Sequence, residues 1–163
     1  MGRRGKMSRS GLSYLEKTSQ DVFGNTIDIP TALDRRTVQR YHCNGTVAAG
    51  DWVMLDTGQT NSARAVTVVQ ATIVALGNPR TVGVALEAGV AGGFINVVTR
   101  GYVEGAAVAT GTALGTPLQM GVGVAGRARV GVAADIAPTI GVCLELAAGN
   151  TCDVYVFGLG SDS

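Results

Sequence analysis

The sequence predicts an all-β protein: a compact, glycine-rich β-barrel or β-sandwich with an extended N-terminal arm. Three features lead to this prediction: short runs of alternating or β-branched residues, glycine-rich turn signals between them, and a strand–turn–strand unit that occurs twice. Glycine supplies 24 of the 163 residues and charged residues only 15%, unlike the charge-rich composition of a disordered chain. No helical periodicity is sustained along the sequence, so a helical domain is not expected.

The expected strands are short, and each lies between turn signals such as Asn-Gly, Ala-Gly-Gly and Gly-Asn-Pro. Many short strands separated by such turns are typical of a sandwich or a barrel. The segments with strand character are 51–56, 65–76, 81–87, 94–100, 128–133, 139–145 and 152–157.

An internal repeat supports the β prediction. Thr81–Glu87 (TVGVALE) matches Thr139–Glu145 (TIGVCLE), and the match continues through a turn into a second strand, so that 81–101 corresponds to 139–158. Successive side chains of a strand point to opposite faces, so we expect the large apolar row to face the core and the small row to admit a close neighbour. The residues of the expected core row are Val82, Val84 and Leu86, with Ile140, Val142 and Leu144 in the second copy.

Charge divides the chain into a basic arm, residues 1–40, and a β-rich domain, residues 41–163. The arm holds eight basic and four acidic residues, a net charge of +4, whereas the domain holds five and eight, a net charge of −3. The arm carries too little apolar surface to fold alone. Its apolar residues recur every few positions and few are aromatic, which favours docking on a protein surface over contact with nucleic acid.

The cysteines and the apolar segments exclude several classes of protein. Cys43, Cys143 and Cys152 form no CxxC or Cys/His cluster, so we expect neither a zinc site nor a disulfide, but buried thiols in a reducing cytoplasm. The longest apolar stretch, 82–98, is interrupted by polar residues and glycines, so no membrane span is expected. The basic N-terminus lacks the apolar segment of a signal peptide, which indicates synthesis in the cytoplasm.

Three patterns could indicate catalysis or nucleotide binding, and each has a structural interpretation. Gly121–Gly126 spells GxGxxG, but strand alternation follows it where a dinucleotide site needs a helix. His42 is the only histidine, and Cys43 beside it would point to the opposite face of a strand. Glu87 and Glu145 could form an acid pair, but both are expected at strand ends. We therefore expect no catalytic, cofactor-binding or metal-binding residues, and nucleotide binding is the weaker alternative.

A series of motifs beginning with Asn44–Val53 (NGTVAAGDWV) resembles a family of small phage capsid decoration, or cement, proteins that is related to head-fibre bases. The resemblance covers about 115 residues, 44–158, and does not include the arm. The further motifs, in the same order as in that family, are 80–87, 91–101, 111–119 (GTALGTPLQ), 126–128, 139–145 and 153–158 (DVYVFG).

The resemblance implies a β-rich virion protein without catalytic residues on the outer surface of a phage head. It further implies a homotrimer that bridges subunits of the major capsid protein after synthesis in the bacterial cytoplasm. The composition of the arm predicts docking on a protein surface, which the resemblance implies to be coat protein, through basic groups and apolar anchors. These contact candidates are Arg3, Arg4, Lys6, Arg9, Leu12, Leu15, Phe23, Ile27, Arg35 and Arg36.

Another virion component is the main alternative. A head-fibre base or spike base would need a further distal domain, and a tail-tube protein would form open rings of six. Neither a membrane nor a nucleic acid is an expected partner, and no cofactor is expected.

Overall fold

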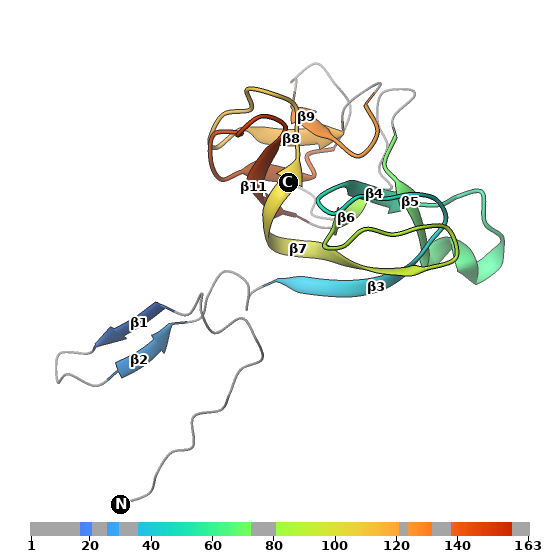
Figure 1. The fold of residues 1–163 in the computed structure, drawn as a ribbon, viewed down its shortest axis with the longest axis horizontal. Coiled ribbons are helices and arrows are strands. Elements are labelled where there is room, and N and C mark those ends of the chain that lie inside the picture. The colour runs from blue at the N-terminus through green and yellow to red at the C-terminus, as the bar shows by residue number, and fades with distance from the viewer. Residues whose placement is uncertain are drawn as a thin grey trace, which may run out of the picture. The chain divides into compact units, whose positions relative to one another are not determined.

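The computed structural model describes residues 17–20, 26–29, 36–72, 81–120, 124–131 and 138–157 (Figure 1). The chain divides into two compact units, Met1–Arg35 and Arg36–Ser163. Regular structure in the described residues is all β-strand apart from one 3₁₀ helix, η3 (Asn61–Ala65). The all-β prediction is therefore confirmed.

The first unit contains a small antiparallel hairpin. Strands β1 (Lys17–Gln20) and β2 (Thr26–Ile29) pair so that Lys17 lies opposite Ile29 and Gln20 opposite Thr26. Two strands alone bury little apolar surface, so such a hairpin is only marginally stable without a partner.

The second unit begins with a closed five-stranded barrel, here called the first barrel (Figure 1). Its strands follow the order β3-β5-β4-β6-β7, and β7 pairs back onto β3 to close the barrel. Valines, Cys43 and Ile95 fill the narrow interior, as expected for a small barrel filled by side chains. The strands are β3 (Thr37–Cys43), β4 (Trp52–Leu55), β5 (Thr67–Gln70), β6 (Thr81–Ala85) and β7 (Phe94–Ala107).

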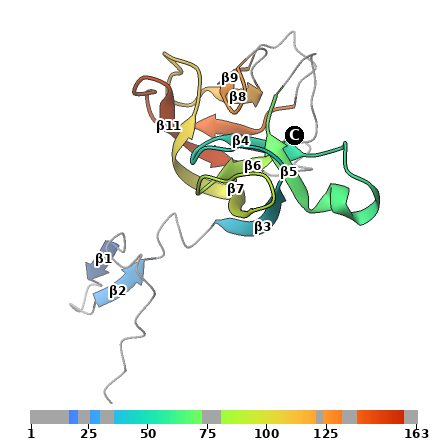
Figure 2. The same ribbon diagram turned by 45° about the vertical axis from the view of Figure 1, so that its right-hand side comes forward.

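Strand β7 belongs to two sheets in turn. Its first half pairs with β3 and β6, and its second half pairs with β11. Figures 1 and 2 show the strand curving from the side of β3 to the side of β11. Gly101 and Gly105 have positive φ values of 106° and 67°, which allow a bend that other residues rarely adopt.

The second half of β7 and the last four strands form a second, less completely closed barrel. Its order is β7-β11-β10-β8-β9, and a single parallel bridge, Val108 to Ala128, links its two ends. The additional strands are β8 (Pro117–Met120), β9 (Ala128–Val130), β10 (Gly141–Cys143) and β11 (Thr151–Val156).

The two barrels are copies of one design. Val53 of β4 pairs with Gly83 of β6, and Leu118 of β8 pairs with Gly141 of β10. The parallel pairing between β3 and β5 has its counterpart in the bridge between Val108 and Ala128. The repeat seen in the sequence is thus the best preserved part of a duplication that includes all five strands.

The barrels differ at the seam, the place where the first and third strands of each barrel along the chain come together. These strands are β3 and β5 in the first barrel, and the second half of β7 and β9 in the second. In the first barrel, the amide of His42 donates directly to the carbonyl of Val66, at 2.8 Å. In the second barrel, the start of β4 inserts at this position: Ala107 N donates to Gly50 O, and Trp52 N donates to Gly126 O. The second barrel has its own direct hydrogen bond here, from Ala109 N to Ala128 O at 2.8 Å, and the segment from the first barrel completes the rest of the closure.

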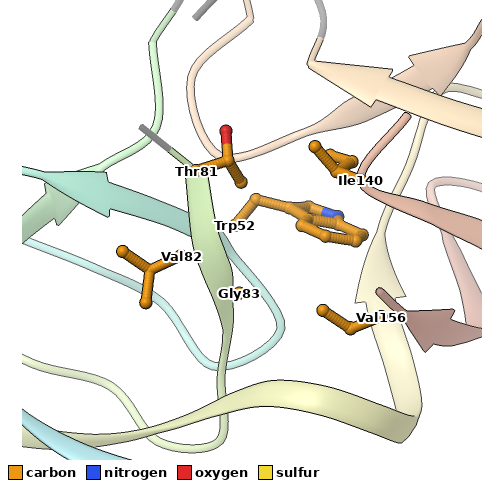
Figure 3. A pocket seen from close by; sticks show the side chains of 6 residues that line it. All are labelled: Trp52, Thr81, Val82, Gly83, Ile140 and Val156. Carbon is orange, nitrogen blue, oxygen red and sulfur yellow. The ribbon is translucent and has the colours of Figure 1, made fainter. Parts of the chain in front are cut away.

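Trp52 fixes this junction. Its side chain is fully buried in the core of the second barrel, and its indole N–H donates to the carbonyl of Ala107 at 3.0 Å. Figure 3 shows the indole beside Gly83 of the first barrel and Ile140 and Val156 of the second. The core of the second barrel therefore includes side chains from the first barrel, which also has a separate core of its own.

Most expected strands form, with shifted ends. β3 starts at Thr37, so the expected boundary at 40/41 falls inside a strand, and the compact unit begins at Arg36 instead. Four strand segments were not expected: β1, the first half of β3, β8, which opens with a proline, and the second half of β7, which contains two glycines. The end of the expected strand 65–76 lies outside the described residues.

In the second barrel the predicted core row is correct for Ile140, which is buried in the core, and wrong for Val142 and Leu144. Gly141 and Cys143 point inward and are buried, whereas Val142 is half-buried and Leu144 is 40% exposed. Both faces of this strand carry apolar or small residues, so alternation alone does not tell which face is inside. In the first barrel both faces of β6 are buried, one in each core.

Candidate interaction surfaces

The structure describes few of the predicted contact residues. Ile27 lies in β2 of the hairpin, and Arg36 is a half-buried residue immediately before β3. The other candidates lie outside the described residues: Arg3, Arg4, Lys6, Arg9, Leu12, Leu15, Phe23 and Arg35.

An exposed cluster of aromatic and basic side chains lies on the outer face of the first barrel, on the paired strands β3 and β7. Phe94 of β7 is 58% exposed. The guanidinium carbon of Arg40 lies 4.9 Å from the centre of its ring, and the ring of His42 meets it edge-on at 5.4 Å. Contacts on two sides hold an aromatic side chain in a fixed orientation on the surface. We call these three residues the Phe94 cluster.

The Phe94 cluster was not predicted, although the spacing of its residues indicates it. Arg40 and His42 are two residues apart, so they share one face of a strand, and Phe94 opens the strand that follows a glycine turn. The expectation that His42 and Cys43 point to opposite faces is confirmed, since Cys43 is fully buried in the first barrel and His42 contacts Phe94 outside.

The GxGxxG string lies between β8 and β9, which pair directly; its first three residues lie outside the described ones. Gly126 is buried with a φ of 73°. A Cβ atom at this position would lie 2.7 Å from the carboxylate of Asp51 and 2.8 Å from Gln70 Nε2. Asp51 is itself buried and accepts hydrogen bonds from Ala48 N and Gln70 Nε2. This glycine thus permits close packing between the barrels, in agreement with the structural interpretation.

Glu87 and Glu145 have equivalent structural roles. Glu87 Oε1 accepts a hydrogen bond from the amide of Asn96 at 2.8 Å, and Glu145 Oε1 accepts one from the amide of Asp153 at 3.1 Å. Each carboxylate thereby links the two strands of its own hairpin. The interpretation of both as strand-end residues is confirmed.

Cys43, Cys143 and Cys152 are buried and free, as predicted. Burial raises the pKa of the Cys43 thiol. Burial also raises the pKa of Cys152, and the neighbouring Cys143 raises it further. The pKa of Tyr102 is raised by burial and by its hydrogen bond to Asp153. Cys43, Cys152 and Tyr102 therefore remain protonated and neutral near pH 7.

A small pocket lies where the two barrels meet (Figure 3). The space open to the centre of a water molecule is about 10 Å³, about the minimum needed to hold one water molecule. Thr81 contributes a buried hydroxyl oxygen that has no hydrogen-bond partner in the described structure. The pocket is lined by Trp52, Thr81, Val82, Gly83, Ile140 and Val156.

Two further observations concern the described residues only. No group of three metal-ligating side chains occurs among them. They also include no helix with the length and apolar character needed to cross a membrane.

The fold is similar to that of a solved phage protein. The base of the head fibre protein gp8.5 from bacteriophage phi29 superimposes with a TM-score of 0.52 at 13% sequence identity. The match covers 74% of this chain and 93% of that chain. At this identity the likeness establishes a shared fold. No protein-family profile matches the sequence, and neither does any curated protein.

Proposed function

We propose that this protein is a phage capsid decoration, or cement, protein that binds the outer surface of the assembled head and stabilises it. The observation that carries the proposal is the fold shared with a phage head-fibre base over 74% of the chain. The sequence motifs of residues 44–158 support it independently, because they resemble a decoration family related to such bases. We propose no catalytic role.

Stabilisation would follow from mass action. A protein that binds only the assembled shell lowers the free energy of that shell relative to its separated subunits. If each particle carries several copies of the arm, as in the homotrimer that the resemblance implies, binding becomes multivalent and modest single contacts add up to tight attachment. The partner would be the major capsid protein.

Two regions would make the contacts with coat protein. The arm supplies a net charge of +4 over residues 1–40. It contains the β1–β2 hairpin, and because isolated two-stranded hairpins are only marginally stable in water, a partner surface would stabilise it. The Phe94 cluster lies on β3 and β7, and β3 follows directly from the arm. Aromatic and arginine side chains dominate binding energy at many protein interfaces.

Co-sedimentation with undecorated heads of the phage that carries the gene tests this proposal. The full chain is compared with a variant that begins at Arg36, where the compact β unit begins. We expect saturable pelleting of the full chain and a loss of about 100-fold or more in affinity without the arm, since multivalent contacts are removed. Matching thermal unfolding of the β unit in both proteins is the control. Equal pelleting of the two proteins would refute the role of the arm, and no pelleting of either would refute head binding.

A head-fibre base is the second candidate, favoured by the fold shared with the phi29 head-fibre base. The two functions differ in their effect on the head. A decoration protein raises the temperature at which heads release their DNA, whereas a fibre base leaves this temperature unchanged. Release of DNA from heads with and without the bound protein, followed with a fluorescent dye during heating, separates the two.

A further inference from the structure

The two barrels carry the same row of cross-strand neighbours on their outer faces. In the first barrel, Trp52 pairs with Val84, and Val84 pairs with Val98. In the second barrel, Pro117 pairs with Val142, Val142 pairs with Tyr155, and Tyr155 pairs with Tyr102. Directly paired residues of antiparallel strands point to the same face. We call the row from Pro117 to Tyr102 the outer row of the second barrel.

The two rows differ in burial. Trp52, Val84 and Val98 have no exposed surface, because the second barrel packs on them. In the outer row of the second barrel, Tyr155 is 36% exposed and Pro117 is also exposed. The same holds for the flanking leucines: Leu86 packs against the core of the second barrel, whereas Leu144 is 40% exposed.

The chemistry of the outer row is that of a contact surface. The hydroxyl of Tyr102 donates to Asp153, and the second oxygen of this carboxylate accepts a hydrogen bond from Gly105 N. The ring of Phe157 lies 6.1 Å from that of Tyr155 and widens the apolar area. Proteins built from stacked repeats usually end in a unit with a polar outer face. The second barrel ends the stack with aromatic and aliphatic side chains instead.

We propose that a second copy of this chain covers the outer row of the second barrel. The molecule itself contains one example of what this fold places on the equivalent row, namely another barrel of the same fold. The carboxylates of Asp153 and Glu145 near this face already accept backbone amide hydrogen bonds, which reduces the cost of covering them. The proposal concerns contact between copies and does not depend on binding to heads.

Sedimentation velocity of the purified full chain over a range of concentrations tests this proposal. Tyr155→Glu places a charge in the centre of the outer row, and Leu144→Ser removes an exposed apolar side chain without altering a paired strand position. Val90→Ser is the control. Val90 is 65% exposed in the turn between β6 and β7 of the first barrel and does not belong to the outer row. Circular dichroism and thermal unfolding verify that each variant is folded.

We expect the wild-type protein to associate, and each outer-row variant to weaken this association by about tenfold or more, as for a central interface residue. The control should associate like wild type. A wild-type protein that stays monomeric up to about 100 µM, or outer-row variants that associate normally, would overturn the proposal. Normal association combined with lost head binding would also overturn it, since coat protein would then be the occupant.

Discussion

The first and second barrels share strand order, pairing and turn positions, yet each is closed in a different way. The first closes through direct hydrogen bonds such as that from His42 N to Val66 O, whereas the second combines one direct bond, from Ala109 N to Ala128 O, with the inserted segment Gly50–Trp52. The closure of the second barrel thus depends in part on a segment of the first barrel, whereas the first barrel closes through its own strands.

Corresponding residues in the two barrels differ in burial. Trp52 is fully buried at the junction, and its counterpart Pro117 lies on an open face. The pair Val98 and Tyr155 shows the same contrast. Burial in this fold is therefore decided by what covers a face, and not by the position of a residue in the strand pattern.

The largest expected effect is at the junction. Trp52→Ala should destabilise the protein by about 3–5 kcal/mol, because it removes a fully buried aromatic side chain, leaves a cavity and leaves the Ala107 carbonyl without its indole donor. The corresponding change Pro117→Ala should cost less than about 1 kcal/mol, since its side chain is exposed. Urea unfolding of both variants measures the difference, and equal losses would contradict the account of the junction.

A smaller effect is expected where two strands of one hairpin approach closely. A Cβ atom at Gly83 would overlap the carbonyl oxygen of Val98, and a Cβ atom at Gly141 would crowd that of Tyr155. Gly83→Ala should cost about 3 kcal/mol, because both faces of β6 are covered and the strand cannot shift. Gly141→Ala should cost less, since β11 borders an open face.

Thermal unfolding of the two glycine variants tests this ranking. Gly58→Ala is the control, because the atom nearest to its Cβ would be the end of the Asp56 side chain. A larger loss at Gly141 than at Gly83 would show that the second barrel is the more tightly held of the two.

The smallest effect is expected at the two glutamates. Glu87→Ala and Glu145→Ala each remove one exposed hydrogen bond to a backbone amide, so each should cost about 0.5–1.5 kcal/mol. Similar losses would agree with their equivalent roles. Hydrogen exchange at the amides of Asn96 and Asp153 should increase in the respective variant only, and unchanged exchange at both amides would contradict these roles.

The sequence predicted the parts of the fold that local patterns determine. Glycine turns and β-branched runs indicated most strands, and the repeat TVGVALE/TIGVCLE identified one hairpin of each barrel. The remaining similarity between the barrels is not visible in the sequence. It consists of backbone pairing, and corresponding side chains such as Trp52 and Pro117 are different. The second half of β7 was missed because its glycines suggest turns, although here they bend a continuous strand.

The interaction surfaces were harder to predict than the fold. The basic arm is visible in composition, whereas the Phe94 cluster requires knowing that β3 pairs with β7. Val142 of the outer row and the flanking Leu144 were expected in the core, because alternating apolar residues of a strand usually face the interior. Its exposure depends on where the stack of barrels ends, which no local pattern encodes.

An electron cryomicroscopy map of heads saturated with the full chain tests the proposed function most directly. The account predicts additional β-barrel density on the outside of the coat shell, contacting more than one coat subunit, and no such density on heads without the protein. Density confined to the tail or the tube, or a bare shell at saturating protein, would contradict the assignment of this protein to the head surface.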